Sequence, residues 1–573
     1  MGNDFYDEKL SKRREYEIQR AALMQERNSY EQHWRELAEF IKPERARFLI
    51  ADKQQSGGKK RSKIIDSSGS MAARTLESGM HAGITSPARP WMRLTTPDPE
   101  LAEYGPVKEW LNIVTQRMLT VFLKSNLYNA LPKVYGDEGT FAVGAMGVLE
   151  DTRDVLRCFT YPIGSYALGV NERGVCDQFV REYPLTVRQI VKEFGVIPGT
   201  RQIDWTNISD TVRHLWDRSR YEQTVEVCWV IAPNEDHDAS KLYAKYLPYG
   251  SCHFEKGSTE EKFLRESGFR EFPVLAPRWE VTSAEDIYGT NCPGMIALGD
   301  IKQLQLGEKR SMQGVDKMVN PPIQAPTSLK NGMVSTLPSS ITYVDVTQGQ
   351  EGVKSIYDVQ LGIDKLEQKQ GQVRYRISRA YFEDLFLMLA TSQDQDTQRT
   401  AREIEERHEE KLLALGPVLE QQNDELLDPL VNRTYAMMER AGMIPDPPDE
   451  LDGVDLKVEY ISVMAQAQKL IGVAGHERFI TGIVNIAEAL PHARHKVNAM
   501  QWVDRYGDML GVDPKVIVPD DQAREAAQAE ADAVRQQQQM EQAAVMTRGA
   551  KDLSGASLEG DTALSRIAQG LRG

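Results

Sequence analysis

The 573-residue sequence predicts an α+β fold, in which helical regions flank a region of antiparallel sheet. Apolar residues recur at helical spacing before residue 139 and again after Pro293. Between these regions, runs rich in β-branched and aromatic residues alternate with turn signals. The chain is several times longer than a typical single domain, so we expect two or more domains.

Composition limits the classes of protein that the chain can belong to. The hydrophobic fraction of 41% and the charged fraction of 27% are ordinary for a soluble globular protein. No apolar run reaches the roughly 18 residues that a transmembrane helix needs, and the charged N-terminus does not read as a secretory signal. We therefore expect no membrane partner. Five cysteines without a CxxC pair favour reduced thiols, and a net charge of −15 argues against tight binding to nucleic acid.

Residues 1–138 form the first predicted region, which is helical. Its first 45 residues carry apolar positions at loosely helical spacing, with Pro43 as a stop signal. Further helices are predicted over Asp66–Ile84 and Val107–Leu131. Pro87 and Pro90 lead us to expect no regular element between these two helices.

Residues 139–292 are predicted to contain the sheet. The strand-like runs are FAVGAMGVLED, LRCFTYPIGSYAL and VCDQFVREYPL. Asn171–Gly174 (NERG) reads as a turn, and Asn234–Ser240 reads as the tip of a hairpin whose second strand covers KLYAKYLPY. A short helix over Thr186–Phe194 interrupts the strands.

Two long helices are predicted next, over 293–320 and 358–390. They are separated by 321–357, which holds only short β-like pieces after the helix-ending stretch NPPIQAP. Each helix has an apolar stripe that the pair cannot bury alone, so assembly into a ring with neighbouring subunits would bury the rest. Residues 391–400 then form a polar segment without one large hydrophobic side chain.

The C-terminal third is predicted to be mostly helical. A capping box at Thr400–Glu403 starts a helix over 401–442, which Pro417 and Pro429 should kink. Residues 443–519 contain one strand, Val454–Val463, followed by helices. Residues 520–548 form an Ala- and Gln-rich helix without a broad apolar face, and 549–573 are expected to be a flexible tail.

The sequence contains no recognisable motif for catalysis or cofactor binding. GGKKRSK fails the phosphate-loop pattern at two positions. His492 and His495 could share a helix face, but no acidic or Cys partner stands at a metal-binding spacing. Asn234–Asp238 (NEDHD) is explained equally well by turn formers. We therefore expect no catalytic residue, no metal and no cofactor, and the protein is not expected to be an enzyme.

Three segments carry a resemblance to a known family. They are GITSPARPWMRL, PPIQAP and TAREIEERHEEKLLALGPVLEQQNDELLDPLVNRTYAMMERAGMIP. In their order and residues they resemble the portal, or head-to-tail connector, proteins of short-tailed bacteriophages, over roughly residues 5 to 510. The third segment is the most specific of the three.

The resemblance implies a dodecameric ring at one vertex of the capsid. Double-stranded DNA would enter through its channel during packaging by a separate terminase and leave through it on infection. The implied partners are further copies of the chain, the terminase large subunit, the major capsid protein and scaffold, and head-tail adaptor or tail proteins. The implied location is the virion, at the portal vertex, with assembly in the host cytoplasm.

The resemblance also implies a portal fold for the predicted regions. In chain order these would be the helical part of the wing (1–138), the α+β wing domain (139–292), stem helix 1 (293–320), a small β-containing clip (321–357), stem helix 2 (358–390), the tunnel loop (391–400), the long kinked wing helix (401–442), the crown (443–519), a C-terminal helix of a barrel or extended crown (520–548), and the tail (549–573).

Candidate site residues follow from these assignments. The tunnel loop would present Ser392, Gln393, Asp394, Gln395 and Asp396 to DNA, with few cations so that DNA can slide; without the resemblance, an ordinary interhelix turn explains this segment. Stem cations that could line the channel, or instead form salt bridges to neighbouring subunits, are Lys302, Lys309, Arg310 and Lys317. Residues of the clip that would dock terminase and adaptor are Pro321, Pro322 and Ile323.

Two other classes of function compete with this interpretation. One is an internal scaffold or adaptor protein of the virion that encloses no DNA channel. The other is an enzyme, either a nuclease or the packaging ATPase itself. The missing phosphate loop counts against the ATPase.

Overall fold

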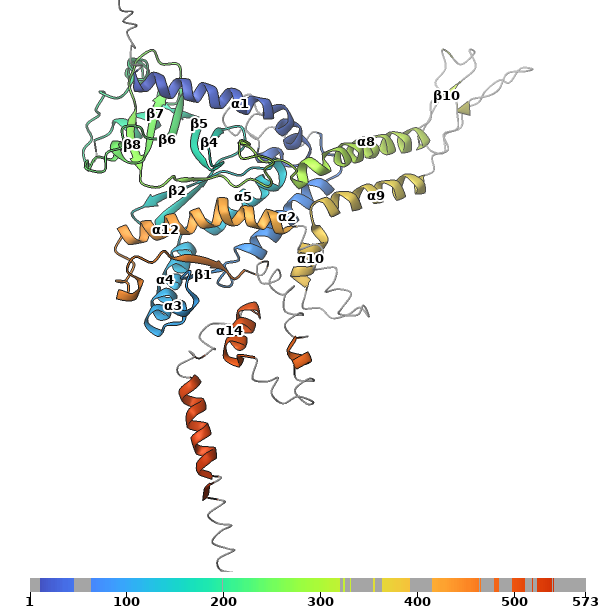
Figure 1. The fold of residues 1–573 in the computed structure, drawn as a ribbon. Coiled ribbons are helices and arrows are strands. Elements are labelled where there is room, and N and C mark those ends of the chain that lie inside the picture. The colour runs from blue at the N-terminus through green and yellow to red at the C-terminus, as the bar shows by residue number, and fades with distance from the viewer. Residues whose placement is uncertain are drawn as a thin grey trace, which may run out of the picture. The chain divides into compact units, whose positions relative to one another are not determined.

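The structure is a computed structural model, and it divides the chain into two compact units (Figure 1). Unit 1 is Met1–Thr95, Trp110–Pro447 and Leu456–Ile471, and unit 2 is Thr96–Glu109, Pro448–Asp455 and Gly472–Gly573. The residues that the structure describes are 11–45, 63–197, 199–319, 323–324, 330, 354–355, 363–391, 415–462, 464, 479–483, 497–510, 518, 523–537 and 539–540.

The first two predicted helices of unit 1 are confirmed. Helix α1 (Lys12–Phe40) begins at Ser11, whose side chain accepts a hydrogen bond from the amide of Arg14, and Pro43 follows its end in a 3-10 turn (Pro43–Arg45). Helix α2 (Ser68–Ile84) matches the second prediction. The indole of Trp34 on α1 donates to the carbonyl of Phe141, which fixes α1 against the centre of the unit.

The third predicted helix is two helices, so the prediction of one over Val107–Leu131 is wrong. Helix α4 (Gly105–Lys124) ends, and α5 (Leu127–Phe141) starts after Asn126. The Asn126 side chain both donates to the carbonyl of Cys158 and accepts from its amide, at 2.8 Å each. A side chain that bonds strand backbone in this way favours a break in the helix.

The expectation of no regular element after Pro90 is also wrong. Strand β1 (Met92–Thr95) pairs antiparallel with β12 (Lys457–Tyr460), with Met92 opposite Tyr460. The two prolines precede the strand and so remove none of its hydrogen bonds. Strand β12 confirms the strand predicted over Val454–Val463, but it is shorter than predicted at both ends.

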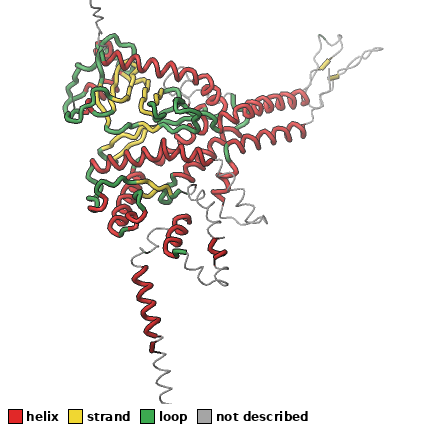
Figure 2. The backbone as a smooth tube through the Cα atoms, viewed as in Figure 1, coloured by secondary structure: helices red, strands yellow, loops and turns green. Residues whose placement is uncertain are grey.

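Two antiparallel sheets lie in the region 139–292, where the sequence predicts a sheet (Figure 2). Two of their strands, β8 (Arg265–Phe269) and β9 (Val274–Leu275), lie outside the predicted strand runs. The smaller has the order β3-β2-β9, with β2 at Met146–Asp151, β3 at Val155–Thr160 and β9 at Val274–Leu275. The larger has the order β4-β5-β6-β7-β8, and its strands are Tyr166–Val170, Cys176–Thr186, Thr224–Pro233, Tyr249–Glu255 and Arg265–Phe269.

Helix α1 covers one face of the five-stranded sheet. Its Tyr16 and Leu23 join Val180, Cys228 and Phe254 in one buried cluster. At one end of the sheet, α6 (Val187–Ile190) and α7 (Asp210–Asp217) cover a second cluster. These packed layers make the antiparallel α+β architecture that the residue pattern predicts.

The turn and the short helix predicted in this region are confirmed, but the second strand of the predicted hairpin starts later than expected. Gly174 has a φ of 73°, as the NERG turn needs, and Thr186 and Gln189 form a capping box at the start of α6. Helix α6 continues as one π-helical turn, Val191–Gly195, so the helix predicted over Thr186–Phe194 is present. The second hairpin strand starts only at Tyr249, because the Asn234 side chain donates to the carbonyls of Lys245 and Leu247 and holds this stretch as a loop.

Helix α8 (Pro293–Val319) confirms the first long helix after the sheets. The second is broken: α9 (Ile363–Ala380) and α10 (Glu383–Thr391) meet at Phe382, which has a φ of 54°. Between α8 and α9, β10 (Ile323–Gln324) pairs antiparallel with β11 (Lys354–Ser355).

The predicted helix over 401–442 is described from residue 415. After 415–422 it contains a π-helical turn (Asn423–Leu427) and continues as α12 (Asp428–Arg440). Pro429 lacks an amide proton, and its ring would clash with the carbonyl four residues earlier. The wider turn relieves this, because the amide of Asp428 donates to the carbonyl of Asn423. Gly442, with a φ of 65°, follows the helix as predicted.

Unit 2 is helical in the parts that the structure describes. It contains α3 (Pro99–Glu103), a 3-10 turn (Asp449–Leu451) and α14 (Ala499–Leu510), in which Trp502 stacks on Tyr506. Residues 523–537 and 539–540 are helical and almost entirely exposed. This agrees with the prediction of a C-terminal helix without a broad apolar face.

Candidate functional site

The paired helices α8 and α9 correspond to the two long helices for which the sequence predicts a functional role. They lie side by side and extend away from the sheets of unit 1 (Figure 1). Arg376 on α9 pairs with Asp300 on α8 at 2.7 Å, and Arg374 pairs with Glu308 at 2.5 Å. The two helices thus form one shaft, and ion pairs at Asp300 and Glu308 join them.

The base of the shaft is fixed to the segment that precedes α2. Gln305 is buried, accepts hydrogen bonds from the amides of Ile65 and Asp66, and donates to the carbonyl of Asp66 at 2.7 Å. Arg374 also reaches the Asp66 carboxylate at 3.0 Å. Burial alone would raise the pKa of Asp66, but hydrogen bonds from Ser68 and Arg374 outweigh it and lower that pKa.

The four predicted stem cations do not share one environment. Lys302 donates to Glu36 on α1 at 2.6 Å and lies over the Phe40 ring, so it ties the shaft to α1. This hydrogen bond is the main cause of a lowered pKa at Glu36. Lys309, Arg310 and Lys317 are exposed on the outer part of α8.

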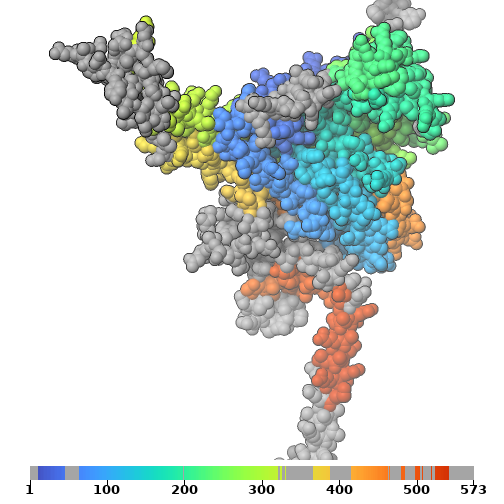
Figure 3. Space-filling view, turned by 180° about the vertical axis from the view of Figure 1, so that it is seen from behind, coloured from blue at the N-terminus to red at the C-terminus, as the bar shows by residue number. Residues whose placement is uncertain are grey.

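The outer part of α8 also exposes apolar side chains. Up to Gln305 the helix buries Ala297, Leu298, Ile301 and Leu304. Beyond it, Met312 is 63% exposed and Val319 is 80% exposed, and further exposed residues of the shaft are Leu306, Val315, Met318 and Tyr375. In Figure 3 the described part of the shaft is a narrow extension of unit 1, shown in yellow-green and yellow. Among the residues that the structure describes, none covers these apolar side chains.

The remaining predicted site residues are mostly not described. Ile323 lies in β10, opposite Ser355 of β11, and is partly exposed. Pro321, Pro322 and Ser392, Gln393, Asp394, Gln395 and Asp396 lie outside the described residues. Their predicted roles therefore stay predictions.

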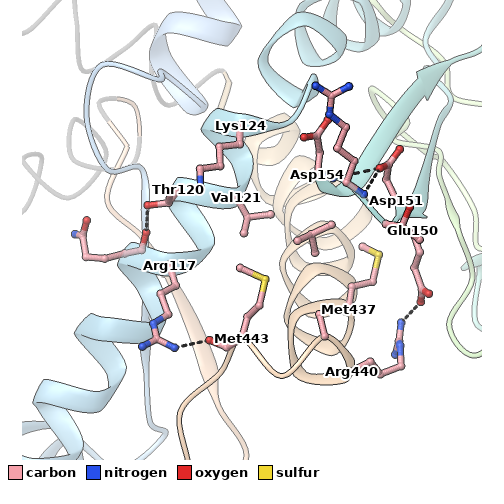
Figure 4. Close-up of a pocket in the computed structure, with 15 residues that line it drawn as sticks. Arg117, Thr120, Val121, Lys124, Glu150, Asp151, Asp154, Met437, Arg440 and Met443 are labelled. Atoms are coloured by element: carbon pink, nitrogen blue, oxygen red, sulfur yellow. Dashed lines mark hydrogen bonds and ion pairs between the residues drawn. The ribbon is translucent and has the colours of Figure 1, made fainter.

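A cavity of about 690 Å³ lies elsewhere in unit 1, between α4, the β2–β3 hairpin and the end of α12 (Figure 4). Several of its polar side chains are engaged by neighbouring groups. Arg117 donates to the carbonyl of Met443 at 2.5 Å, Arg440 pairs with Glu271 at 2.7 Å, and Asp151 accepts from the amide of Arg153 at 2.7 Å. No sequence pattern marks this cavity, since its three walls are far apart in the chain. Its lining contains no arrangement suited to acid–base or nucleophilic chemistry.

The metal-like sequence patterns resolve into turns where the structure shows them. Asp238 of the NEDHD segment accepts from Ser240 and Lys241, and these contacts lower its pKa to about 2. Across the part of the chain that is described, no three His, Cys, Asp or Glu side chains are grouped so as to hold a metal ion. His492 and His495 lie outside that part. Nor does any described helix combine the length and apolar character needed to cross a membrane.

Comparison with known proteins covers nearly the whole chain. The family model of the bacteriophage head to tail connecting protein matches residues 13–518. The portal protein of Salmonella phage epsilon15 is 47% identical over 550 residues, which are 96% of this chain and 97% of that protein. The probable portal protein of Bordetella phage BPP-1 is 42% identical over 528 residues, 92% of each chain. The chain therefore belongs to the head-to-tail connector family of bacteriophages, the family of their portal proteins.

Proposed function

We propose that twelve copies of this chain form a ring at one capsid vertex, through which double-stranded DNA enters the head during packaging and leaves on infection. The observation that carries the proposal is the match to two phage portal proteins over more than nine tenths of the chain. The family is structural, so the chain acts as a conduit and a docking platform and catalyses no reaction itself. Terminase supplies the energy for packaging.

The exposed apolar surface of the shaft supports the proposal of a ring. Its outer apolar residues, such as Met312 and Val319, are exposed in one chain, and burial of a side chain of this size is worth about 1.5–3 kcal/mol. Neighbouring shafts packed around an axis would cover them. On this proposal α8 and α9 are the stem, and 321–357 is the clip that meets terminase and then the tail adaptor, through Pro321, Pro322 and Ile323.

The other assignments follow the same order. Residues 1–292 and 401–442 form the wing, 391–400 the tunnel loop, and 443–548 the crown with its C-terminal helix. Ser392, Gln393, Asp394, Gln395 and Asp396 would face DNA. Twelve chains of charge −15 give a ring of about −180, which disfavours a tight hold on phosphate.

The stem cations receive separate roles. Lys302 is neutralised by Glu36 and serves to fix the stem to the wing. Lys309, Arg310 and Lys317, which are exposed on α8, are the channel-lining candidates. The major capsid protein and scaffold would hold the ring in the virion, after assembly in the host cytoplasm.

The first test is the particle mass of the purified protein, combined with negative-stain top views. A ring with a central hole wide enough for duplex DNA, and a mass near twelve chains of 64.7 kDa, supports the conduit. An open assembly without a hole favours an internal scaffold or adaptor. If only monomers or dimers form, scaffold protein is added, and the absence of rings even then rejects the proposal.

A further inference from the structure

Glu138 is a fully buried carboxyl group in the core of unit 1. It lies in α5, near the end of that helix, and has no exposed surface. Gln422, which is also fully buried, donates from its Nε2 to Glu138 Oε1. Each partner keeps one further buried oxygen, Glu138 Oε2 and Gln422 Oε1, and neither oxygen has a hydrogen-bond partner among the residues that the structure describes.

One proton would satisfy both of these oxygens. An ionised carboxylate only accepts hydrogen bonds, so it leaves Gln422 Oε1 and Glu138 Oε2 as two unpaired acceptors. Each unsatisfied buried polar atom of this kind destabilises the fold. A neutral carboxylic acid instead donates from Oε2 to the amide oxygen, while its Oε1 accepts from the amide nitrogen.

We propose that Glu138 is kept as a neutral acid, which forms a reciprocal two-hydrogen-bond pair with Gln422 and thereby locks the long helix onto α5. Gln422 is the residue directly before the π-helical turn Asn423–Leu427. The pair therefore fixes the point at which this helix departs from regular geometry. The lock concerns the fold of each chain, and it does not depend on ring formation or on DNA.

The charged groups around Glu138 favour the neutral form. Glu425, which lies in the π-helical turn directly after Gln422, contributes a negative charge near Glu138. Arg278 donates to the Glu425 carboxylate and so is already engaged. The other titratable groups that face Glu138 are Tyr135 and Cys292, whose pKa values are raised by burial. Burial first, and then the charge of Glu425, raise the pKa of Glu138 well above the ordinary glutamate value of 4.5.

The sign of the pH effect follows from this direction. The stability that the neutral pair contributes is fully present below pH 4.5, where the unfolded chain is also protonated at this residue. As pH rises above 4.5, the glutamate of the unfolded chain ionises while Glu138 in the folded chain stays neutral. The contribution to stability therefore decreases steadily with pH, and the decrease ends at the pKa of the folded state. Over that interval the unfolding equilibrium constant rises roughly tenfold per pH unit from this residue alone.

Glu138→Gln tests the lock, because a glutamine reproduces the neutral acid. Its Nε2 can donate to Gln422 Oε1, and its Oε1 can accept from Gln422 Nε2. We expect the variant to melt near the wild-type temperature at pH 4.5 and above it at pH 8, with a difference that grows with pH. The control is Glu439→Gln, an exposed glutamate on α12, which should shift the melting temperature equally at every pH.

A Glu138→Gln difference that does not change with pH, or a variant that is less stable at pH 8, would overturn the lock. A second measurement needs no variant. In wild-type protein labelled with 13C-glutamate, infrared spectra at pH 8 should contain the carbonyl stretch of an un-ionised glutamic acid. If only carboxylate bands are present at pH 8, the proposal is wrong.

Discussion

At the scale of the residue, Arg278 joins three distant segments of unit 1. Its backbone amide and its Nε donate to Glu425 on the long helix at 2.8 and 2.9 Å, and its Nη2 donates to the carbonyl of Gly174 at 2.7 Å. It also donates to the carbonyl of Asp286. Arg278 is buried and Glu425 nearly so, which makes the pair much less screened by water than a surface pair.

We expect Arg278→Ala to lower the free energy of unfolding by about 3–5 kcal/mol, because it leaves a carboxylate largely buried without its partner. The measurement is denaturant or thermal unfolding. Arg188→Ala is the matched control, since Arg188 also pairs with a glutamate, Glu222, but both side chains are exposed. It should cost at most about 1 kcal/mol. Equal losses in the two variants would show that Arg278 does not hold the segments together.

His253 gives a second prediction at this scale. It stacks on Trp229 in the five-stranded sheet, and burial, with the charges of Arg265 and Arg181, lowers its pKa from 6.5 to about 3. The unfolded chain therefore binds a proton that the folded chain excludes, and this residue removes stability as pH falls from 6.5 towards 3.

His253→Phe keeps an aromatic ring in the stack and removes the titration. Its melting temperature should rise relative to wild type as pH falls below 6.5. His214→Phe, at an exposed position, should show no such relative gain. Parallel melting curves for wild type and His253→Phe across this pH range would contradict the prediction.

At the scale of the element, the β2–β3 hairpin holds a strained residue. Val155 has a φ of 70°, which costs a β-branched residue about 1–2 kcal/mol. The turn before it is fixed by Asp151, whose carboxylate accepts from the amides of Arg153 and Asp154. The chain therefore enters β3 in a conformation that suits glycine.

Val155→Gly should stabilise the protein by roughly 0.5 kcal/mol, because the relief of about 1–2 kcal/mol of strain exceeds the roughly 0.5–1 kcal/mol of conformational entropy that glycine costs. Thermal unfolding measures it. Val175→Gly is the control, because Val175 follows another hairpin turn without a positive φ and is exposed. It should lose roughly 0.5–1 kcal/mol. A loss of stability in both variants would mean that Val155 carries no relievable strain.

Elements set by local chemistry were predictable from the sequence. Ser11 and the pair Thr186 and Gln189 begin helices with their own side chains, and the stop at Pro43 is equally local. The break at Phe382 could not be foreseen, because nothing local selects a left-handed phenylalanine. Strand β1 was missed because its partner is remote: the ion pair between Arg93 and Glu459 joins residues 366 apart.

The candidate site also has features that local sequence predicts and features that depend on contacts between distant residues. The apolar stripe and the cations of α8 follow from helical spacing, so the sequence located them. The partner of Lys302 on α1 lies 266 residues away, and that of Glu138 lies 284 residues away. Contacts over such separations depend on the packing of unit 1, which residue patterns do not encode.

At the scale of the whole molecule, the exposed apolar face of α8 should decide whether chains associate. Met312 and Val315 lie on its outer part and are both exposed in the single chain. In the proposed ring, every interface between neighbouring subunits would bury both side chains. A substitution that removes them would therefore weaken every interface of the ring. Burial of two such side chains at about 1.5–3 kcal/mol each is enough to change the affinity of an interface by two or more orders of magnitude, since about 1.4 kcal/mol corresponds to a factor of ten.

The double variant Met312→Gln/Val315→Gln removes this apolar surface while it keeps residues that tolerate a helix. We expect rings to give way to monomers or small oligomers in mass measurements, with an unchanged far-ultraviolet circular dichroism spectrum. The control is Leu242→Gln, which changes an even more exposed apolar residue in the β6–β7 loop and should leave rings intact. If the double variant still forms rings at the wild-type concentration, the ring is held by other surfaces, and α8 must face the channel or solvent there.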